Sequence, residues 1–505
     1  MSTNKCAGRP MSQQLLLLGL GAVLSSSLPS STIVGPPTLV YGFYASHCPR
    51  LPQTGCSLSI AEGCDCDIAD APMRMWRRSG SDSQVFSLAS VDLGSRAMIG
   101  SSPTSLQHSC SLYANSTRHQ AFGEYANYEW IHSSWYFSAN NTVYALTHME
   151  WDCKSADTCA FYGQGYTFFS AVTLMMSPDG GGSWRHALPP PAHIVAVSPV
   201  PWTEAIGASG QSFGFRSPSS IVAGRGAQSG FFFASVTAGW GSGAFQGQAQ
   251  GACMMRTRDL TDPAAWRAWG GAGFTVSLAA SPYGREPPPD PAAHACTPFS
   301  NITYASLLWS EVFGAYMYFG TAQGDDHGGW QFMLSSDLES WSGLTTVAAP
   351  QQYIVPAGNA SWTPSGRNFT GRFVMPQGSS DPQVWWEDDA RAVKRRVGSC
   401  TPCPGVSACS SIVRIPASEF NALVERAAFS CSWMFNTSGY SDYYYPTLID
   451  PSSASDNFDS AGPNALLFLV AQACANVGGD GKCTPFDQDG LLVRDLIRAP
   501  VSFSN

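Results

Sequence analysis

Charged side chains are scarce in this 505-residue chain: Asp, Glu, Lys and Arg together make up 12% of it, and the net charge is −9. The densest positive cluster, Arg391 to Arg396, comes directly after three acids, Glu387, Asp388 and Asp389. Binding to nucleic acid depends on Lys and Arg placed against phosphates. We therefore expect no nucleic-acid partner.

Long apolar runs are nearly absent as well. The single run, Leu15 to Leu24, follows Lys5 and Arg9 and precedes small residues up to Ser31. This order of basic, apolar and small segments is typical of a cleavable secretory signal, with a helical anchor as the alternative. No later run approaches the roughly 18 apolar residues that a membrane span requires. We expect residues 1–30 to be a signal peptide and the mature protein, without a membrane span, to be secreted or held at the cell surface.

The cysteines lack the histidines that would complete a zinc finger, so disulfide bonds are favoured over zinc for the closely spaced ones. There are 16 cysteines, and removal of Cys6 with the signal leaves an odd number, with room for one free thiol. Six Asn-x-Ser/Thr triplets are expected glycosylation sites on surface loops. The closely spaced cysteines are Cys64 and Cys66, Cys153 and Cys159, and Cys400, Cys403 and Cys409; the triplets begin at Asn115, Asn140, Asn301, Asn359, Asn368 and Asn436.

Glycine, proline and aromatic residues are plentiful, with 49 Gly, 35 Pro and 12% aromatic residues, which favours short strands and predicts an all-β chain. One turn recurs along it. Ser177 to Trp184 fits S-x-D-x-G-x-[ST]-W and resembles the Asp-box of sialidase-like propellers, in which Asp and Ser bond back to the turn. Looser copies contain Asp259 and Asp337, and the intervals from Asp179 onward are 80 and 78 residues.

Each interval suits one four-stranded blade with long loops, the marker falling between its third and fourth strands. The expected strands around the markers include Glu129 to Phe137, Thr142 to His148, Cys253 to Thr257 and Ile302 to Trp309. Counting one period back and one forward predicts a five-bladed β-propeller. The last blade needs an edge partner, which we expect from Thr32 to Phe43. Residues 346–440 fit the repeat poorly and hold three of the triplets and four cysteines. The predicted division is 1–30 for the signal, 32–345 for blades one to four with the closing strand, 346–440 for a glycosylated Cys-containing insertion, and 441–505 for the final blade.

Acids from three blades are expected on one face of the ring, because strands alternate in direction outward from the axis. Asp70 precedes the first strand of blade one, Glu150 ends the second strand of blade two, and Asp325, Asp326 and His327 occupy the equivalent loop of blade four. Convergent carboxylates supply the proton donor and the base or nucleophile of glycoside cleavage. They also suit calcium, which takes oxygen ligands from several loops; no other cofactor is expected.

Ala69 to Trp76 resembles the opening blade of five-bladed glycosidases such as arabinanases and β-xylosidases, in which an Asp just before a Pro is the base. The wider chain resembles uncharacterised secreted or bacterial proteins similar to those enzymes, over about residues 65–345 and 440–500. The resemblance implies that Asp70 is the base. It also implies an acid in a Glu-Gly-Pro or Glu-Cys-Pro motif, but the corresponding opening, Arg216 to Ser220, holds no carboxylate. Glu150 is the substitute that the expected geometry offers.

Four further residues are candidates for substrate contacts. Arg74 is expected to clamp a carboxylate or a hydroxyl pair, or to pair with Asp70. His148 is expected to orient the nearby acid or a ligand hydroxyl, with a structural histidine as the alternative. Trp151 and Tyr445 offer faces on which a sugar can stack, with core packing as the alternative.

The primary hypothesis is a secreted glycoside hydrolase that acts on a polysaccharide or glycan, with Asp70 as base or nucleophile and Glu150 as acid. The first alternative is a carbohydrate-binding propeller that kept the scaffold without the acid. The second is a cell-surface interaction module in which the insertion binds protein and the mouth holds calcium. A sialidase is a weaker hypothesis, because no cluster of three arginines can be identified. We expect a monomer in each case.

Overall fold

The computed structural model describes the strands and most of the connections between them. Within the described residues, helical structure is confined to three 3-10 turns of three or four residues and to the single residue Ser46, so the chain is all-β. No helix there is long and apolar enough to cross a membrane. The described residues are 29–33, 37–42, 46, 48, 67, 69–79, 84–91, 94–115, 123–152, 168–203, 213–239, 248–284, 289–322, 330–347, 372–375, 383–388, 393–402, 413–416, 429–432, 440–473, 476–477, 483–484 and 494–504.

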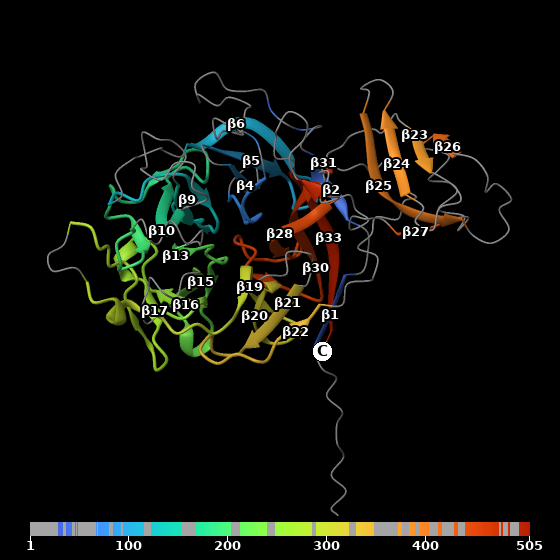
Figure 1. The fold of residues 1–505 in the computed structure, drawn as a ribbon. Helices are drawn as coiled ribbons and strands as arrows, with labels where there is room; N and C mark the ends of the chain where they lie inside the picture. The colour runs from blue at the N-terminus through green and yellow to red at the C-terminus, as the bar shows by residue number, and fades with distance from the viewer. Residues whose placement is uncertain are drawn as a thin grey trace, which may run out of the picture.

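Five groups of mainly antiparallel strands follow one another along the chain and surround a common middle in Figure 1, from blue through green and yellow to red. Group one is β3 (Met75–Arg77), β4 (Val85–Val91), β5 (Gly94–Gly100) and β6 (Gln107–Asn115). Group two is β7 (Glu129–Ile131) and β8 (Trp135–Phe137) along β9 (Thr142–Asp152), then β10 (Phe168–Ser177), β11 (Arg185–His186) and β12 (Ile194–Ala196). Group three is β13 (Phe213–Arg216) and β14 (Val222–Ala223) along β15 (Phe232–Ala238), then β16 (Gly251–Thr257), β17 (Arg267–Trp269) and β18 (Phe274–Val276). Group four is β19 (Ile302–Ser310), β20 (Ala315–Ala322), β21 (Trp330–Ser335) and β22 (Thr345–Thr346), with β29 (Ser460–Ala461) beside β19.

Group five joins the two ends of the chain. Its order is β28 (Tyr440–Ile449), β30 (Asn464–Ala473), β33 (Arg494–Ser504), and β33 pairs with both β1 (Ser30–Ile33) and β2 (Thr38–Tyr41). Two short strands therefore occupy the edge where one closing strand was expected over Thr32 to Phe43. This pairing gives the last long strand a partner that an open edge would lack.

Groups two and three together form one 12-stranded sheet, because β10 of group two pairs in parallel with β13 of group three. Gly214 makes this close approach possible. It has φ +99°, and a Cβ at this position would collide with the carbonyl oxygen of Ser170. A side chain there would be strained both by its backbone conformation and by the neighbouring strand.

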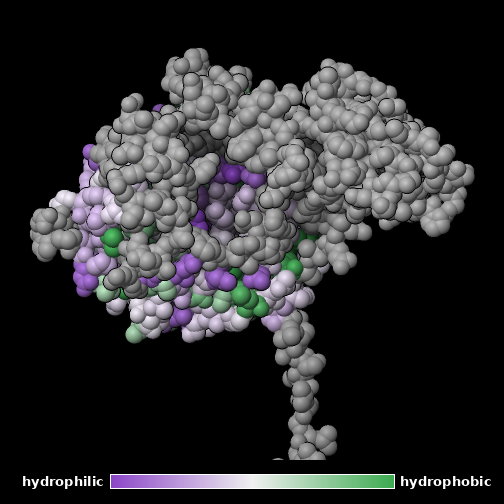
Figure 2. Space-filling view, in the orientation of Figure 1, coloured by the Kyte–Doolittle hydropathy of each residue, from purple (hydrophilic) through white to green (hydrophobic). Residues whose placement is uncertain are grey.

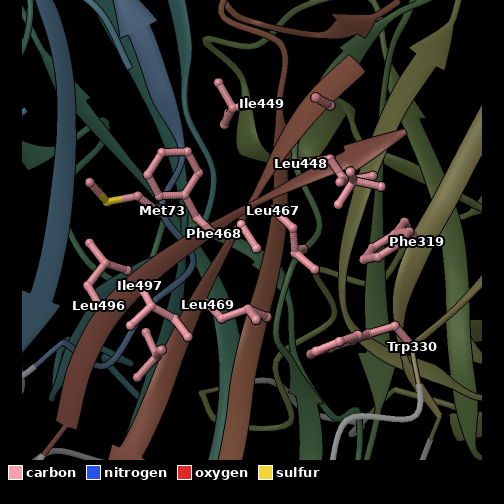
Figure 3. Packing of buried hydrophobic residues seen from close by; sticks show 14 of the residues in the cluster. Met73, Phe319, Trp330, Leu448, Ile449, Leu467, Phe468, Leu469, Leu496 and Ile497 are labelled. Carbon is pink, nitrogen blue, oxygen red and sulfur yellow. The ribbon is translucent and has the colours of Figure 1, made fainter. Parts of the chain in front are cut away.

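The core of group five packs against groups one and four. Figure 3 shows Leu467, Phe468 and Leu469 of β30 with Met73 from group one and Trp330 from group four. These residues belong to one cluster of buried apolar side chains. Burial of this kind is the main favourable term in folding, so the last group is held to both of its neighbours.

A small cavity lies at the middle of the ring. Its volume is about 20 Å³, which is room for one water molecule. Each of the five groups contributes to its wall: Arg74, Ser134, Ser220, Leu307 and Thr447 come from groups one to five in turn. The five groups therefore face a common centre.

The three marker turns lie in equivalent connections. Asp179 lies between β10 and β11, Asp259 between β16 and β17, and Asp337 between β21 and β22. Each connection joins the third and fourth strands of its group, which is the position that the repeat predicts.

Two disulfides connect cysteines far apart in sequence, Cys48 with Cys110 and Cys253 with Cys296, across separations of 62 and 43 residues. Of the six triplets, those at Asn115, Asn140 and Asn301 are described, and all three asparagines are exposed. The other three triplets lie outside the described residues.

The segment 346–440 contributes a separate sheet, drawn in orange in Figure 1. Its order is β26 (Val413–Pro416), β23 (Arg372–Met375), β24 (Gln383–Asp388), β25 (Val393–Pro402) and β27 (Phe429–Ser432). A short pair, β31 (Asn476–Val477) and β32 (Cys483–Thr484), precedes β33.

Candidate functional site

Two residues from distant parts of the chain meet at Asp70, which lies just before β3. The Tyr445 hydroxyl, in β28, donates to Asp70 Oδ1 at 3.1 Å, and Arg494, at the start of β33, forms an ion pair with the same oxygen. The Asp70 and Arg494 side chains are 22% and 14% exposed, so the pair is reachable from solvent. Burial opposes the charge on Arg494, but Asp70 and the neighbouring tyrosines outweigh it and hold the pKa of the guanidinium above its ordinary value.

The second acid, Glu150, lies near the end of β9 with its side chain 23% exposed. His148 Nε2 is 3.3 Å from Glu150 Oε1, but this contact lacks hydrogen-bond geometry. Among the described residues, His148 Nε2 has no hydrogen-bond partner. Burial, followed by the charge of Arg216, lowers the pKa of His148 to about 3. The imidazole beside Glu150 is therefore neutral at neutral pH.

Aromatic rings connect the two acids. The His132 ring meets the rings of Tyr445 and His148 edge-on, with centroids 5.5 and 5.2 Å away. Burial raises the pKa of Tyr445 well above its ordinary value, and the charges of Asp70 and Glu150 raise it further. Tyr445 therefore bonds to Asp70 and lies within electrostatic reach of Glu150.

Positive backbone φ angles accompany the strands around this centre. Tyr128, Ser217, Tyr304 and Tyr445 have φ of 41°, 48°, 51° and 55°, a region that side chains larger than glycine rarely adopt. The register of β19 and of β28 shifts at Tyr304 and Tyr445 respectively. Bulges of this kind re-aim side chains and are frequent beside functional sites. They turn these two tyrosine rings toward each other, 4.7 Å apart.

Arg74 lies inside the ring and is bonded to several groups. It donates to the carbonyl oxygens of His132 at 3.2 Å and Ala305 at 2.6 Å, and to the hydroxyls of Ser306 at 2.7 Å and Thr447 at 3.2 Å. Burial lowers its pKa to about 9. These bonds connect groups one, two, four and five, so the structure favours a structural role for Arg74 over the ligand clamp that the sequence predicted.

Trp151 is packed against other aromatic rings. It is 3% exposed, and its rings stack on Phe169 at 5.7 Å and contact Trp202 at 5.7 Å. Both faces are committed to the core of group two, which favours packing over sugar stacking. Asp325, Asp326 and His327 lie outside the described residues, so their placement at the mouth, and calcium there, stay predictions.

The sequence named Asp70, Glu150, His148 and Tyr445 as site residues, and the structure places Tyr445 against Asp70 and His148 against Glu150. Sequence reasoning did not name Arg494 or His132. Arg494 begins the last strand, and only its pairing beside β30 and β28 brings it to Asp70. His132 lies in a break between β7 and β8, where the amides of His132 and Ser133 both donate to the carbonyl of Leu146. A continuous strand had been expected there, and no sequence signal marks the break.

Hydrophilic residues line a hollow near the middle of the face seen in Figure 2. The two partly exposed acids and their neighbours form the candidate site. It presents an acid paired with arginine, an acid beside a neutral histidine, and tyrosine rings between them. Such a set can bind hydroxyl groups and can transfer protons.

No family model and no curated protein matches the chain. Among solved structures it is similar to the catalytic domain of a Coprinopsis cinerea family 62 α-L-arabinofuranosidase, with 12% identity over 85% of this chain and 97% of that one and a TM-score of 0.27. It is also similar to a thermostable family 43 glycoside hydrolase, with 8% identity over 85% and 89% of the two chains and a TM-score of 0.34. A third is an exo-β-1,3-galactanase from Clostridium thermocellum, with 11% identity over 85% and 92% and a TM-score of 0.31. The chain thus resembles glycoside hydrolases, as its motifs predicted; because the TM-scores lie below 0.5, its function is inferred from its own residues.

Proposed function

We propose that this chain is a secreted, five-bladed β-propeller that cleaves a glycosidic bond at the centre of its ring. Five strand groups that share one strand order and one axial cavity support the blade count. The sheet of 346–440 is then an insertion before the last blade. The turns at Asp179, Asp259 and Asp337 are its Asp-boxes, and the disulfides and exposed triplets fit export.

The observation that carries this proposal is the pair of partly exposed carboxylates around Tyr445, one bonded to its hydroxyl and the other within electrostatic reach. Arg494 favours the ionised form of Asp70, as a base or nucleophile requires. Glu150 lies beside the His148 imidazole, which burial keeps neutral. This neighbour therefore adds no positive charge that would favour loss of the proton from Glu150. The two carboxyl groups therefore differ in environment, which is how a site assigns the roles of base and acid.

The test is release of reducing sugar by the purified full chain from a panel of arabinosyl, xylosyl and galactosyl polysaccharides. Asp70→Asn and Glu150→Gln should each lose release while their thermal melts stay close to wild type. Asp179→Asn is the control, because it makes the same change at an exposed acid outside the site. Release that survives in both site variants contradicts the assignment.

One observation favours a second function. Asp70 already forms an ion pair with Arg494, and no carboxylate stands at Arg216 to Ser220. A propeller that binds glycans without cleaving them would keep such an arrangement. Glycan-array binding with no release from any bound glycan supports this alternative and rejects the hydrolase.

A further inference from the structure

A second set of ionisable side chains lies away from the central site, within group two. Glu129 begins β7, His186 ends β11, and His193 directly precedes β12. One ligand atom from each of the three lies within 4.8 Å of the others. The strands that carry them all belong to the sheet built on β9 and β10, so the backbone holds the three side chains close together.

The distances between these atoms lie on either side of the spacing between ligand atoms in a metal site. Glu129 Oε2 is 2.7 Å from His186 Nε2, and Glu129 Oε1 is 3.9 Å from His193 Nε2. A tetrahedral zinc ion with bonds of about 2.0–2.1 Å spaces its ligand atoms about 3.3 Å apart. Small rotations of the two rings would bring all three atoms to that spacing.

Two of the three side chains are almost fully buried. The Glu129 side chain is 1% exposed and that of His193 is 0% exposed, whereas His186 is 18% exposed. A buried carboxylate is costly unless a cation or strong hydrogen bonds accompany it. The Thr173 hydroxyl donates to Glu129 Oε1 at 2.8 Å, and His193 Nε2 donates to the Tyr125 carbonyl at 3.2 Å, a hydrogen bond that an ion on this nitrogen would replace. Carboxylate and carbonyl oxygens with two imidazoles form a mixed oxygen and nitrogen ligand set.

We propose that Glu129, His186 and His193 bind one divalent transition-metal ion of the zinc class. Two imidazoles and one carboxylate select such an ion over calcium or magnesium, which prefer oxygen ligands alone. The partly exposed His186 gives the ion its entry path.

The same segment supports the acid of the central site. The Tyr128 carbonyl accepts from the Glu150 amide at 2.9 Å, and the Asn127 side-chain amide donates to the Glu150 carbonyl at 3.0 Å. An ion on Glu129 therefore fastens the segment 125–129 to the outer strands of its group. Its role is structural, and it would stiffen the backbone against which Glu150 rests.

The proposed ligands differ in the hydrogen bonds that hold them in place. Thr173 holds Glu129, but among the described residues His193 Nδ1 is buried without a hydrogen-bond partner. This ring nitrogen must carry the proton when Nε2 binds the ion. Ligating histidines usually donate that proton to an acceptor, and loss of such a partner weakens metal affinity about 10- to 100-fold. We expect an affinity weaker by that factor than in a fully supported site.

The test measures metal, not glycan release, so it fails or succeeds independently of the proposed function. The full chain is dialysed against a chelator and titrated with Co²⁺ and Zn²⁺, and bound metal is counted by elemental analysis. We expect one ion per chain, a visible Co²⁺ spectrum of low coordination number that Zn²⁺ abolishes, and a higher melting temperature with Zn²⁺.

The variants are His186→Gln, at the most exposed ligand, and Glu129→Gln. His108→Gln is the matched control, because His108 also contacts a buried acid, Asp67, while the third member of that cluster, Cys48, is held in a disulfide. We expect His186→Gln to melt like metal-free wild type and to lose the ion, and His108→Gln to keep it. Absence of stoichiometric metal in wild type, or its retention in folded His186→Gln, overturns the proposal.

Discussion

The acids of the marker turns and the acids of the central site differ in where their partners come from. Asp179 Oδ1 accepts from the Ser177 hydroxyl at 2.7 Å and from the Ser183 amide at 2.9 Å, and Asp337 Oδ1 accepts from the amides of Glu339 and Ser340 at 2.9 and 2.8 Å. All of these partners lie within four residues of the acid. Although burial acts to raise them, these bonds hold the pKa of Asp179 and of Asp337 below the ordinary value.

Asp70 depends instead on Tyr445 and Arg494, which are 375 and 424 residues away in sequence. These two partners are ionisable side chains. A turn acid is thus satisfied locally and has little capacity left for chemistry, whereas a site acid is held in place by groups that can themselves exchange protons. Residue type alone does not separate the two kinds.

Replacement of Asp70, the acid paired with Arg494, should have the largest effect on activity and so separate site acids from turn acids most clearly. We expect Asp70→Asn to lower kcat/KM by about 10³-fold, because loss of a group that transfers or accepts a proton costs 10²- to 10⁴-fold. Asparagine keeps an acceptor for Arg494, so the melting temperature should move by only a few degrees. Initial rates on the best glycan of the panel measure the effect; rates equal to wild type would remove Asp70 from the mechanism.

Glu150→Gln should have the next largest effect. We expect a loss of about 10²-fold in kcat/KM, since the amide cannot donate an acidic proton. The pH profile of kcat/KM should also lose its alkaline limb, which reports the acid. An unchanged bell-shaped profile in Glu150→Gln would show that another group is the acid.

The two regions should respond to pH in different windows. His148 has a folded pKa of about 3 against 6.5 for the exposed side chain, so below pH 6.5 only the unfolded chain takes up its proton. The free energy of unfolding should therefore fall by about 1.4 kcal/mol per pH unit from this residue as pH drops from 6.5 toward 3. Urea melts across that range should show a shallower slope in His148→Gln.

The turn acids act in a lower window. Because the pKa of folded Asp179 lies below 3.8, its stabilising effect is complete above pH 3.8 and is lost only as pH falls through the folded value. If the free energy of unfolding falls with equal steepness below pH 6.5 in wild type and in His148→Gln, the loss of stability in acid comes from other groups.

The smallest effect is expected at the turn. Asp179→Ala removes the acceptor of the Ser183 amide and hydroxyl. Loss of a comparable side-chain cap costs about 1 kcal/mol, while glycan release should stay within twofold of wild type. Chemical denaturation and initial rates on the same sample check both parts. A large loss of activity at unchanged stability would contradict the separation of turn from site.

Much of the fold could be predicted, because strands and turns leave local marks. The runs expected near Thr142, Cys253 and Ile302 appear as β9, β16 and β19 within a few residues. The strand expected over Glu129 to Phe137 is divided into β7 and β8, and this break could not be predicted because it depends on a bulge against Leu146. The break is what frees His132 to contact Tyr445.

The amino-acid order determined by itself the features whose partners lie a few residues apart: the turns at Asp179 and Asp337, the strand periodicity and the all-β class. Only the tertiary structure decided that Arg494 pairs with Asp70, that Arg74 bonds across the centre, and that Trp151 is buried against Phe169. The physical reason is distance along the chain. A turn closes its own hydrogen bonds whatever the rest of the molecule does, but a site built from β3, β9, β28 and β33 exists only once the strand groups have packed around one axis.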